Sequence, residues 1–190
     1  MRRAALLFML GLLLAGCGLK PTPDLQAEEN AIYLALFQGI LGPEAKLLVI
    51  EDHTSTFGAL YNWKQTSQYI KENLPAVAPE TLADFQARNA QPQPLKDFLS
   101  IPIPTVLFSE QERNEIFQSS GNGWDEFYRR YPGAPGLSAI SRAGLNKDRT
   151  QAFVYIGTQS HYLAGVGYYV LLVKENGTWK VSNQLMAWIS

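Results

Sequence analysis

The residues best suited to acid–base chemistry are the two histidines of the chain and the carboxylates beside one of them. His53 follows Glu51 and Asp52 at the end of a predicted strand, and His161 lies in a predicted connection between strands. A histidine beside a carboxylate can act as a general base, and His53 with Glu51 and His161 could also form a sparse metal site. Alternation along a strand places Glu51 and His53 on one face and Asp52 on the other. A solvated strand end is the alternative interpretation of these residues.

The sequence lacks the usual motifs of catalysis and cofactor binding. No His-x-x-x-His or His-Glu-x-x-His spacing occurs, so zinc has none of its common signatures. Ser160 and His161 are adjacent, and adjacent residues do not form a nucleophile–base pair unless the fold bends them together. Residues 136–140 lack the second glycine of a nucleophile elbow. We therefore expect no catalytic residue, no cofactor and no metal ion.

The only cysteine, Cys17, ends the segment Leu14-Ala15-Gly16-Cys17. This segment follows Arg2, Arg3 and an apolar run over residues 4–14, which is short for a membrane span and typical of an export signal. It resembles the lipobox of bacterial lipoproteins. The resemblance implies cleavage before Cys17 and acylation of that residue, and two or more acyl chains give stable anchoring. An ordinary signal peptide with an incidental cysteine is the alternative.

The lipobox divides the chain into three predicted parts. Residues 1–16 are the signal peptide, residues 17–30 the lipidated cysteine and a tether, and residues 31–190 one domain. Pro21 and Pro23 favour an extended stem in the tether. In Gram-negative lipoproteins an aspartate after the lipidated cysteine marks retention in the inner membrane. Because Gly18 occupies that place, the resemblance implies the outer membrane if the source is Gram-negative.

Charge and thiol content restrict the partners of the exported chain. The formal net charge is −1, and Arg2 and Arg3 are the only charged residues in 1–16, so the remainder carries about −3. A mildly acidic chain without a basic run predicts no nucleic-acid binding. With Cys17 acylated, no thiol remains for a disulfide, a nucleophile or a metal ligand. Membrane contact is therefore expected only through the acyl chains.

Helical patterns dominate the first two thirds of the chain. Apolar residues recur at helical spacing before Gly42, which ends the first helix. Ser109 and Glu112 have the spacing of a capping box. Aromatic residues crowd the last helix, where they fit either packing or a patch for carbohydrate or a protein partner. The predicted helices cover residues 27–41, 59–73, 79–89, 109–118 and 124–130.

The last third has the alternation and turns of strands. Asn176-Gly177 predicts a tight hairpin, which gives the pairs Lys174–Trp179, Leu172–Val181 and Tyr168–Leu185. This register predicts one apolar face, while the opposite face is half-solvated. Residues 157–167 are interpreted as a long connection whose glycines form bulges. The predicted strands cover residues 46–50, 138–145, 151–157, 167–174 and 178–189, and the apolar face holds Tyr168, Val170, Leu172, Trp179, Val181 and Leu185.

The order of these elements predicts an α+β fold with N-terminal helices packed on a C-terminal antiparallel meander, in a single domain. Residues 141–156, 163–169 and 175–181 resemble a group of uncharacterised bacterial exported proteins, a likeness that implies no activity. The end of the chain, from the strand before Lys174 to Val181, is also similar to NTF2-like domains. The strand predicted directly after the first helix departs from that family.

The sequence therefore predicts a lipid-anchored bacterial envelope protein with a binding or structural role, whose partner is an envelope protein or a small ligand. Two alternatives stay open. One is an envelope hydrolase that uses His53 or His161 with a nearby carboxylate. The other is an NTF2-like binder of a small ligand.

Overall fold

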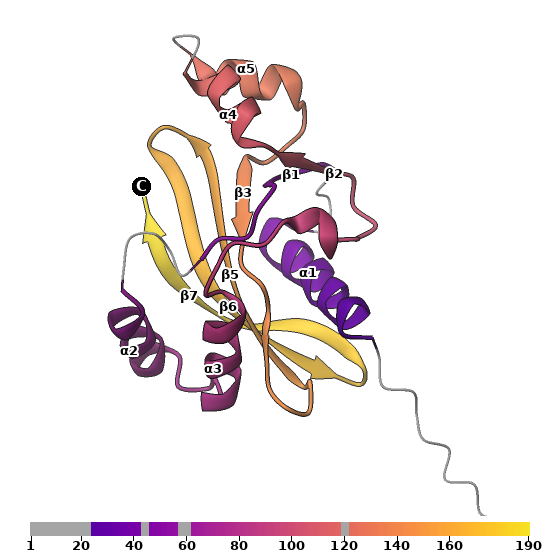
Figure 1. Cartoon of the computed structure of the whole chain (residues 1–190), viewed down its shortest axis with the longest axis vertical. Coiled ribbons are helices and arrows are strands. Elements are labelled where there is room, and N and C mark those ends of the chain that lie inside the picture. Colours follow the sequence, from indigo (N-terminus) through magenta and orange to yellow (C-terminus); the bar gives the residue numbers. More distant parts are fainter. Residues whose placement is uncertain (1–23, 43–45, 57–61, 119–121) are drawn as a thin grey trace, which may run out of the picture.

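The centre of the molecule is one mixed β-sheet flanked by helices. The structure is a computed structural model, and it describes residues 24–42, 46–56, 62–118 and 122–190. The strands lie in the order β2-β1-β3-β5-β6-β7, with β4 paired to β5 (Figure 1). Their bounds are β1 Leu48–Glu51, β2 Thr105–Phe108, β3 Leu137–Ile140, β4 Gly144–Leu145, β5 Gln151–His161, β6 Ala164–Glu175 and β7 Thr178–Ile189. The predicted α+β class, with helices mostly before the strands, is confirmed.

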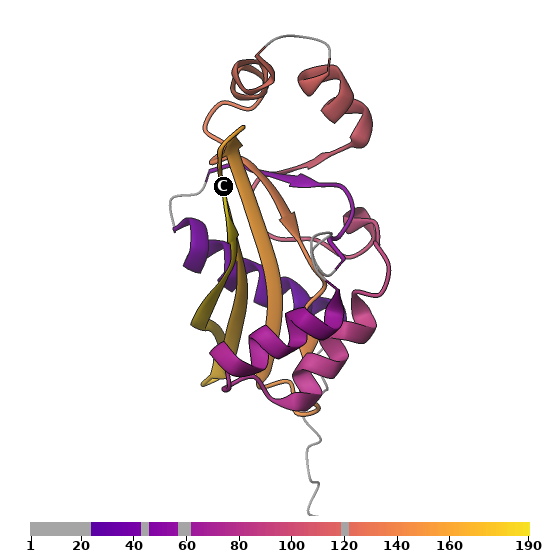
Figure 2. The ribbon, with the colours of Figure 1, turned by 90° about the vertical axis from the view of Figure 1, so that its left-hand side faces the viewer.

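Helices cover both faces of the sheet. Helix α1 (Leu25–Leu41) lies on one face, and α2 (Trp63–Asn73) and α3 (Pro79–Arg88) lie on the other (Figure 2). Helices α4 (Glu110–Phe117) and α5 (Gly123–Arg130) lie at one end of the sheet. A short 3-10 helix covers Leu95–Asp97. The expectation of a half-solvated sheet holds only in part: Lys180, Ser182 and Gln184 are exposed, but Phe153, Tyr169 and Leu171 pack against residues of α2 and α3.

The capping box predicted at α4 is present. The Ser109 side chain accepts from the Glu112 backbone N–H, and the Glu112 carboxylate accepts from the Ser109 N–H. Residues 59–61 of the predicted second helix lie outside the described residues, and α2 begins at Trp63 after the Asn62 cap.

The first helix begins earlier than the predicted tether allowed. Asp24 caps α1 by accepting from the Gln26 N–H, and the helix starts at Leu25. The next turn carries two acids that are buried, Glu28 and Glu29. The Glu28 carboxylate accepts from Lys174 Nζ and from the Trp179 indole N–H, so this turn is attached to the β6–β7 hairpin. The tether predicted over residues 17–30 therefore ends before Leu25.

Glu29 joins α1 to two other parts of the chain. Its carboxylate accepts from Arg142 Nε at 2.7 Å, from Arg88 Nη2 at 3.2 Å and from the Tyr33 hydroxyl at 3.2 Å. The guanidinium of Arg142 also lies 4.0 Å from the centre of the Phe98 ring. A buried carboxylate needs such partners, because desolvation of an unpaired charge is costly.

This attachment interrupts a predicted strand. Residues 141–143 turn toward α1 and α3, so the strand predicted over 138–145 is divided into β3 and β4. Another difference is β2, which is not among the predicted strands. It pairs in parallel with β1. The strand was not predicted because its four residues are too few to show a clear alternation in the sequence.

The C-terminal hairpin agrees with its prediction near the turn and departs from it further away. Asn176 has φ 51° and Gly177 has φ 82°, which is the conformation of a type I′ turn. The pairs Lys174–Trp179 and Leu172–Val181 are confirmed. A register shift between Leu171 and Leu172 then places Tyr168 opposite Met186. The pair Tyr168–Leu185 was therefore wrong, and Leu185 packs on the face of α2 and α3.

Candidate functional site

The acidic candidate of the sequence, Glu51, lies at the end of β1 on the same side of the sheet as α4. Its carboxylate forms an ion pair with Arg113 of that helix. Burial raises the pKa of the Glu51 carboxyl; the Arg113 charge opposes this and the Asp52 charge adds to it. Glu51 is therefore paired to a cation and not to His53.

His53 contacts the neighbouring carboxylate instead. Its Nδ1 lies 2.8 Å from the Asp52 carboxylate, and the His53 side chain is 53% exposed. Pro94 and Lys96 line a shallow hollow beside this pair. This pair has the carboxylate partner of a catalytic base but not its burial.

The two histidines lie far apart along the strands. The registers of β1 with β3 and of β3 with β5 place His53 near the level of Tyr155, six residues before His161. At about 3.3 Å per residue this separates them by roughly 20 Å. His161 stacks on Trp124, with ring centres 6.4 Å apart. Within the described ranges no group of three or more His, Cys, Asp or Glu side chains could hold a metal ion, and no hydroxyl is hydrogen-bonded to either imidazole.

The connection predicted over residues 157–167 is instead strand. β5 continues to His161 and β6 starts at Ala164, so the turn itself is only Tyr162-Leu163. The interpretation of the glycines as bulges holds in part, because register shifts occur after Gln159 and beside Gly167. A second reason for them is space for an indole ring.

Trp188 lies on three of these glycines. A Cβ added at Gly165 or Gly167 would first meet the Trp188 ring, and one added at Gly157 would meet the Tyr155 hydroxyl and then this ring. The Trp188 indole N–H donates to the Tyr155 hydroxyl at 2.7 Å. Glycine is therefore required here because the ring occupies the volume of a side chain.

The same face carries a row of small residues across the sheet. Gly157 pairs with Ala139 on one side and with Gly167 on the other, and Gly167 pairs with Trp188. Extending the β1–β3 register by one residue puts Glu51 beside Ala139. The row therefore runs from the Glu51 carboxylate to the Trp188 indole ring. Burial raises the pKa of the Tyr155 hydroxyl, and the negative charge of Glu51 raises it further.

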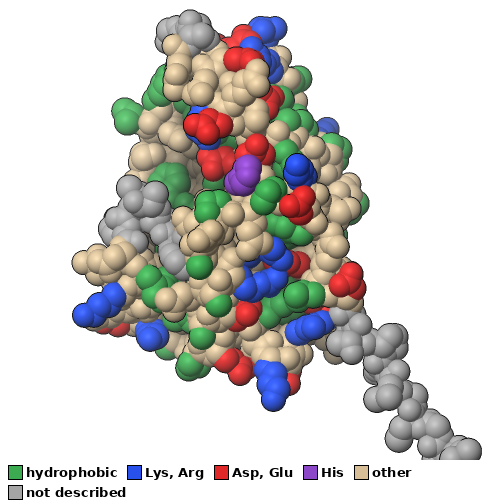
Figure 3. Space-filling view, in the orientation of Figure 1, with side chains coloured by type: hydrophobic (Ala, Val, Ile, Leu, Met, Phe, Trp, Pro, Cys, Tyr) green, Lys and Arg blue, Asp and Glu red, His purple; other side chains and the backbone are tan. Residues whose placement is uncertain are grey.

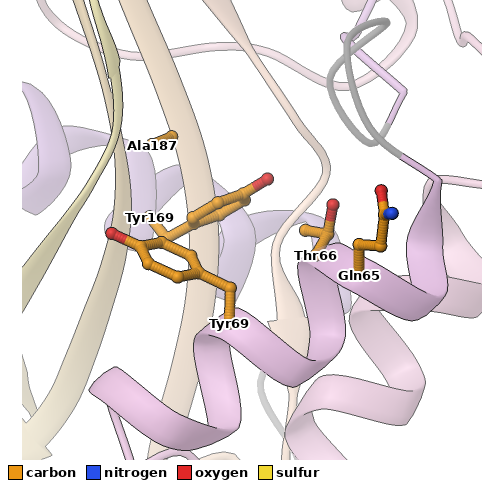
Figure 4. A pocket seen from close by; sticks show the side chains of 5 residues that line it. All are labelled: Gln65, Thr66, Tyr69, Tyr169 and Ala187. Atoms are coloured by element: carbon orange, nitrogen blue, oxygen red, sulfur yellow. The ribbon is translucent and has the colours of Figure 1, made fainter.

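A cleft lies beside this row, between α2 and strands β6 and β7. Its cavity has a volume of about 370 Å³ and is lined by Gln65, Thr66, Tyr69, Tyr169 and Ala187 (Figure 4). The Tyr69 hydroxyl donates to the Met186 carbonyl at 2.9 Å, which fixes the ring between helix and strand. The cavity falls within the range of about 300–1,000 Å³ typical of small-ligand sites. This cleft is the candidate functional site.

No protein-family model, curated protein or solved structure matches this chain.

The cleft residues were missed because their signal in the sequence is weak. Helix α2 is polar in overall composition, and of its residues only Thr66 and Ile70 are buried. The signal that could have indicated the site is Tyr69, a large aromatic residue on a polar helix that remains 41% exposed. Tyr169 could not be recognised, because alternation alone does not show which helix covers a strand.

The aromatic segment of α5 is mainly a packing feature. Trp124 is 3% exposed and Phe127 is fully buried, and both belong to one cluster with Phe108 and Ile116. These two rings are therefore not available on the surface for the carbohydrate or partner patch that the sequence suggested for this helix.

Cys17 and residues 1–16 lie outside the described residues. Among the helices that the structure describes, none has the length and apolar content needed to cross a membrane.

Proposed function

We propose that this chain is a lipid-anchored bacterial envelope protein whose folded domain binds a ligand. The observation that carries the anchor is Cys17, the only cysteine, placed directly after Leu-Ala-Gly at the end of an apolar run with a basic start. In this proposal two or more acyl chains on Cys17 hold the protein in the membrane. The outer membrane is the destination if the source is Gram-negative, because Gly18 follows the cysteine.

The position of α1 supports a close attachment to the membrane. Seven residues, 18–24, separate Cys17 from the first helical residue, and such a segment spans at most about 25 Å. Glu28 and Glu29 then attach the start of α1 to the sheet. The start of α1 lies beside the β6–β7 hairpin, while α4 and α5 lie at the other end of the sheet (Figure 1). We therefore propose that the hairpin end is the end nearer the membrane.

The binding role is supported by the cleft beneath α2. Its shape depends on Tyr69, which is held in place by a hydrogen bond to β7. The hydrolase alternative needs either histidine with a nearby carboxylate. His53 has Asp52 beside it at an exposed site, whereas His161 stacks on Trp124. The small-ligand alternative retains a specific site in this cleft.

Metabolic labelling with a radioactive or clickable fatty acid tests the anchor. Wild-type protein should be labelled and recovered with membranes, and Cys17→Ser should lose both properties. In a Gram-negative host, Gly18→Asp should keep the label and move the protein to the inner membrane. Equal labelling of wild type and Cys17→Ser would refute the proposal.

A further inference from the structure

We infer that the cleft between α2 and strands β6–β7 binds a neutral saccharide, with one sugar ring against Tyr69. This inference rests on the binding role proposed above and names the ligand class for that role. It follows from the charge, the shape and the polar groups of the cleft.

The lining determines that the ligand is neutral. The described lining residues carry phenol, amide, hydroxyl and methyl groups, and none carries a carboxylate, an ammonium or a guanidinium group. A charged ligand would lose its hydration here without gaining an opposite charge, which is unfavourable. A neutral ligand avoids this cost.

Tyr69 offers a ring face that is already in position. The ring projects from α2 over the cleft, is 41% exposed and is held by its hydroxyl at the Met186 carbonyl (Figure 4). A ring fixed before binding loses little side-chain entropy when a ligand arrives. The C–H face of a pyranose is apolar and can cover such a ring, while the hydroxyl groups at its edge remain polar.

The polar groups favour a saccharide over a hydrocarbon ligand. Gln65 and Thr66 are consecutive on α2, and their polar ends point in the same direction (Figure 4). A hydrocarbon in the cleft would remove the exposed Gln65 amide from water without pairing it, which is unfavourable. The hydroxyl groups of a sugar can donate to and accept from this amide.

The volume sets the length of the ligand. A cavity of about 370 Å³ lies at the lower end of the range for small-ligand sites. This size fits a mono- or disaccharide, and a longer glycan would extend out of the cleft into solvent.

Isothermal titration calorimetry of the full-length protein tests the inference. The protein is extracted in an amine-oxide detergent, because detergents with sugar headgroups would compete. N,N′-diacetylchitobiose and cellobiose are the neutral probes, and chitobiose, which carries two amines, is the charged counterpart. We expect at least one neutral disaccharide to bind, and chitobiose to bind at least tenfold more weakly than its diacetylated form.

Variants connect the binding to the cleft. Tyr69→Ala should weaken binding about tenfold or more, whereas Tyr69→Phe should retain most of it because the ring remains. Tyr162→Ala is the matched control, since Tyr162 is 47% exposed and its hydroxyl accepts from the Gly123 N–H at the α5 end of the sheet. Binding by this control should be unchanged. Circular dichroism of each variant establishes that it is folded.

Three results would overturn the inference: no binding of either neutral probe at millimolar concentration, tighter binding of chitobiose than of its diacetylated form, or equal affinity of wild type and Tyr69→Ala. Mass spectrometry of the same preparation reports the state of Cys17. Acylated protein that binds no sugar refutes the ligand class alone, and sugar binding by protein without acyl chains refutes the anchor alone.

Discussion

Glu29 connects three segments of the chain through one carboxylate. It is 1% exposed, and the side chains that meet it come from α1, from α3 and from the segment after β3. Its partner Arg142 is 113 residues away in sequence. No local pattern predicts such a pair, because helical periodicity only indicates which residues are buried. The expected tether was too long for this reason.

Glu29→Ala should destabilise the protein strongly. Two guanidinium groups would remain in a largely buried site without their carboxylate, and breaking a buried ion pair in this way costs about 3–5 kcal/mol. Urea unfolding followed by circular dichroism measures the loss. Glu126→Ala is the control, because that acid pairs with exposed arginines on α5. Equal midpoints for the two variants would contradict the central position of Glu29.

Glu51 should titrate above the ordinary range of a glutamate. Burial raises its pKa despite the charge of Arg113. A carboxyl with a raised pKa binds its proton more tightly in the folded state. Its contribution to stability is therefore present below the unfolded pKa of about 4.3 and is lost as the pH rises through the folded pKa.

Carbon-detected NMR of the carboxyl groups measures this midpoint. Glu51→Gln should remove the corresponding part of the pH dependence of unfolding. A Glu51 midpoint at or below 4.3, the ordinary value quoted above, would contradict the effect of burial.

Among the elements, the β6–β7 hairpin shows which strand pairs can be predicted from the sequence and which cannot. The Asn176-Gly177 turn and the first pairs were predictable because both turn residues need positive φ. The register shift between Leu171 and Leu172 was not predictable, because no residue type at this point requires a β-bulge. One extra residue moves every later side chain to the other face, which is why Leu185 was assigned to the wrong side.

Gly177→Val should destabilise the hairpin. Its φ of 82° is accessible to glycine, while a β-branched residue is penalised by about 1–2 kcal/mol in left-handed backbone. The thermal unfolding midpoint should fall for Gly177→Val and hardly move for Thr178→Ser. An unchanged midpoint for Gly177→Val would show that this turn does not contribute to the stability of the sheet.

The contact of the Trp188 ring with Gly167 can be tested by a double-mutant cycle. Gly167→Ala places a methyl group against the indole ring and should cost about 1–3 kcal/mol, as overpacking does. In a Trp188→Ala background most of this cost should disappear, because the volume is vacant. The same cost in both backgrounds would mean that another neighbour makes glycine necessary.

At the scale of the whole molecule, composition and order of elements were sufficient for the α+β class. They were insufficient for the cleft, which forms where α2 packs on β6 and β7, two strands that lie much later in the chain. On the face shown in Figure 3, Lys and Arg side chains are interspersed with Asp and Glu side chains. The anchor that we propose does not need a basic surface, because it attaches through Cys17.

The anchor and the cleft lie on different parts of the molecule. The anchor would attach at the start of α1, beside the β6–β7 hairpin, whereas α2 covers the opposite face of the sheet (Figure 2). In this arrangement the cleft would be free to bind its ligand while the acyl chains are in the membrane.

The proposed anchor can be tested by mass spectrometry of the N-terminal peptide from membrane-extracted protein. We expect a mature chain that begins at Cys17, without residues 1–16, and carries a diacylglyceryl group on sulfur. An unmodified Cys17, or a chain that retains residues 1–16, would contradict it.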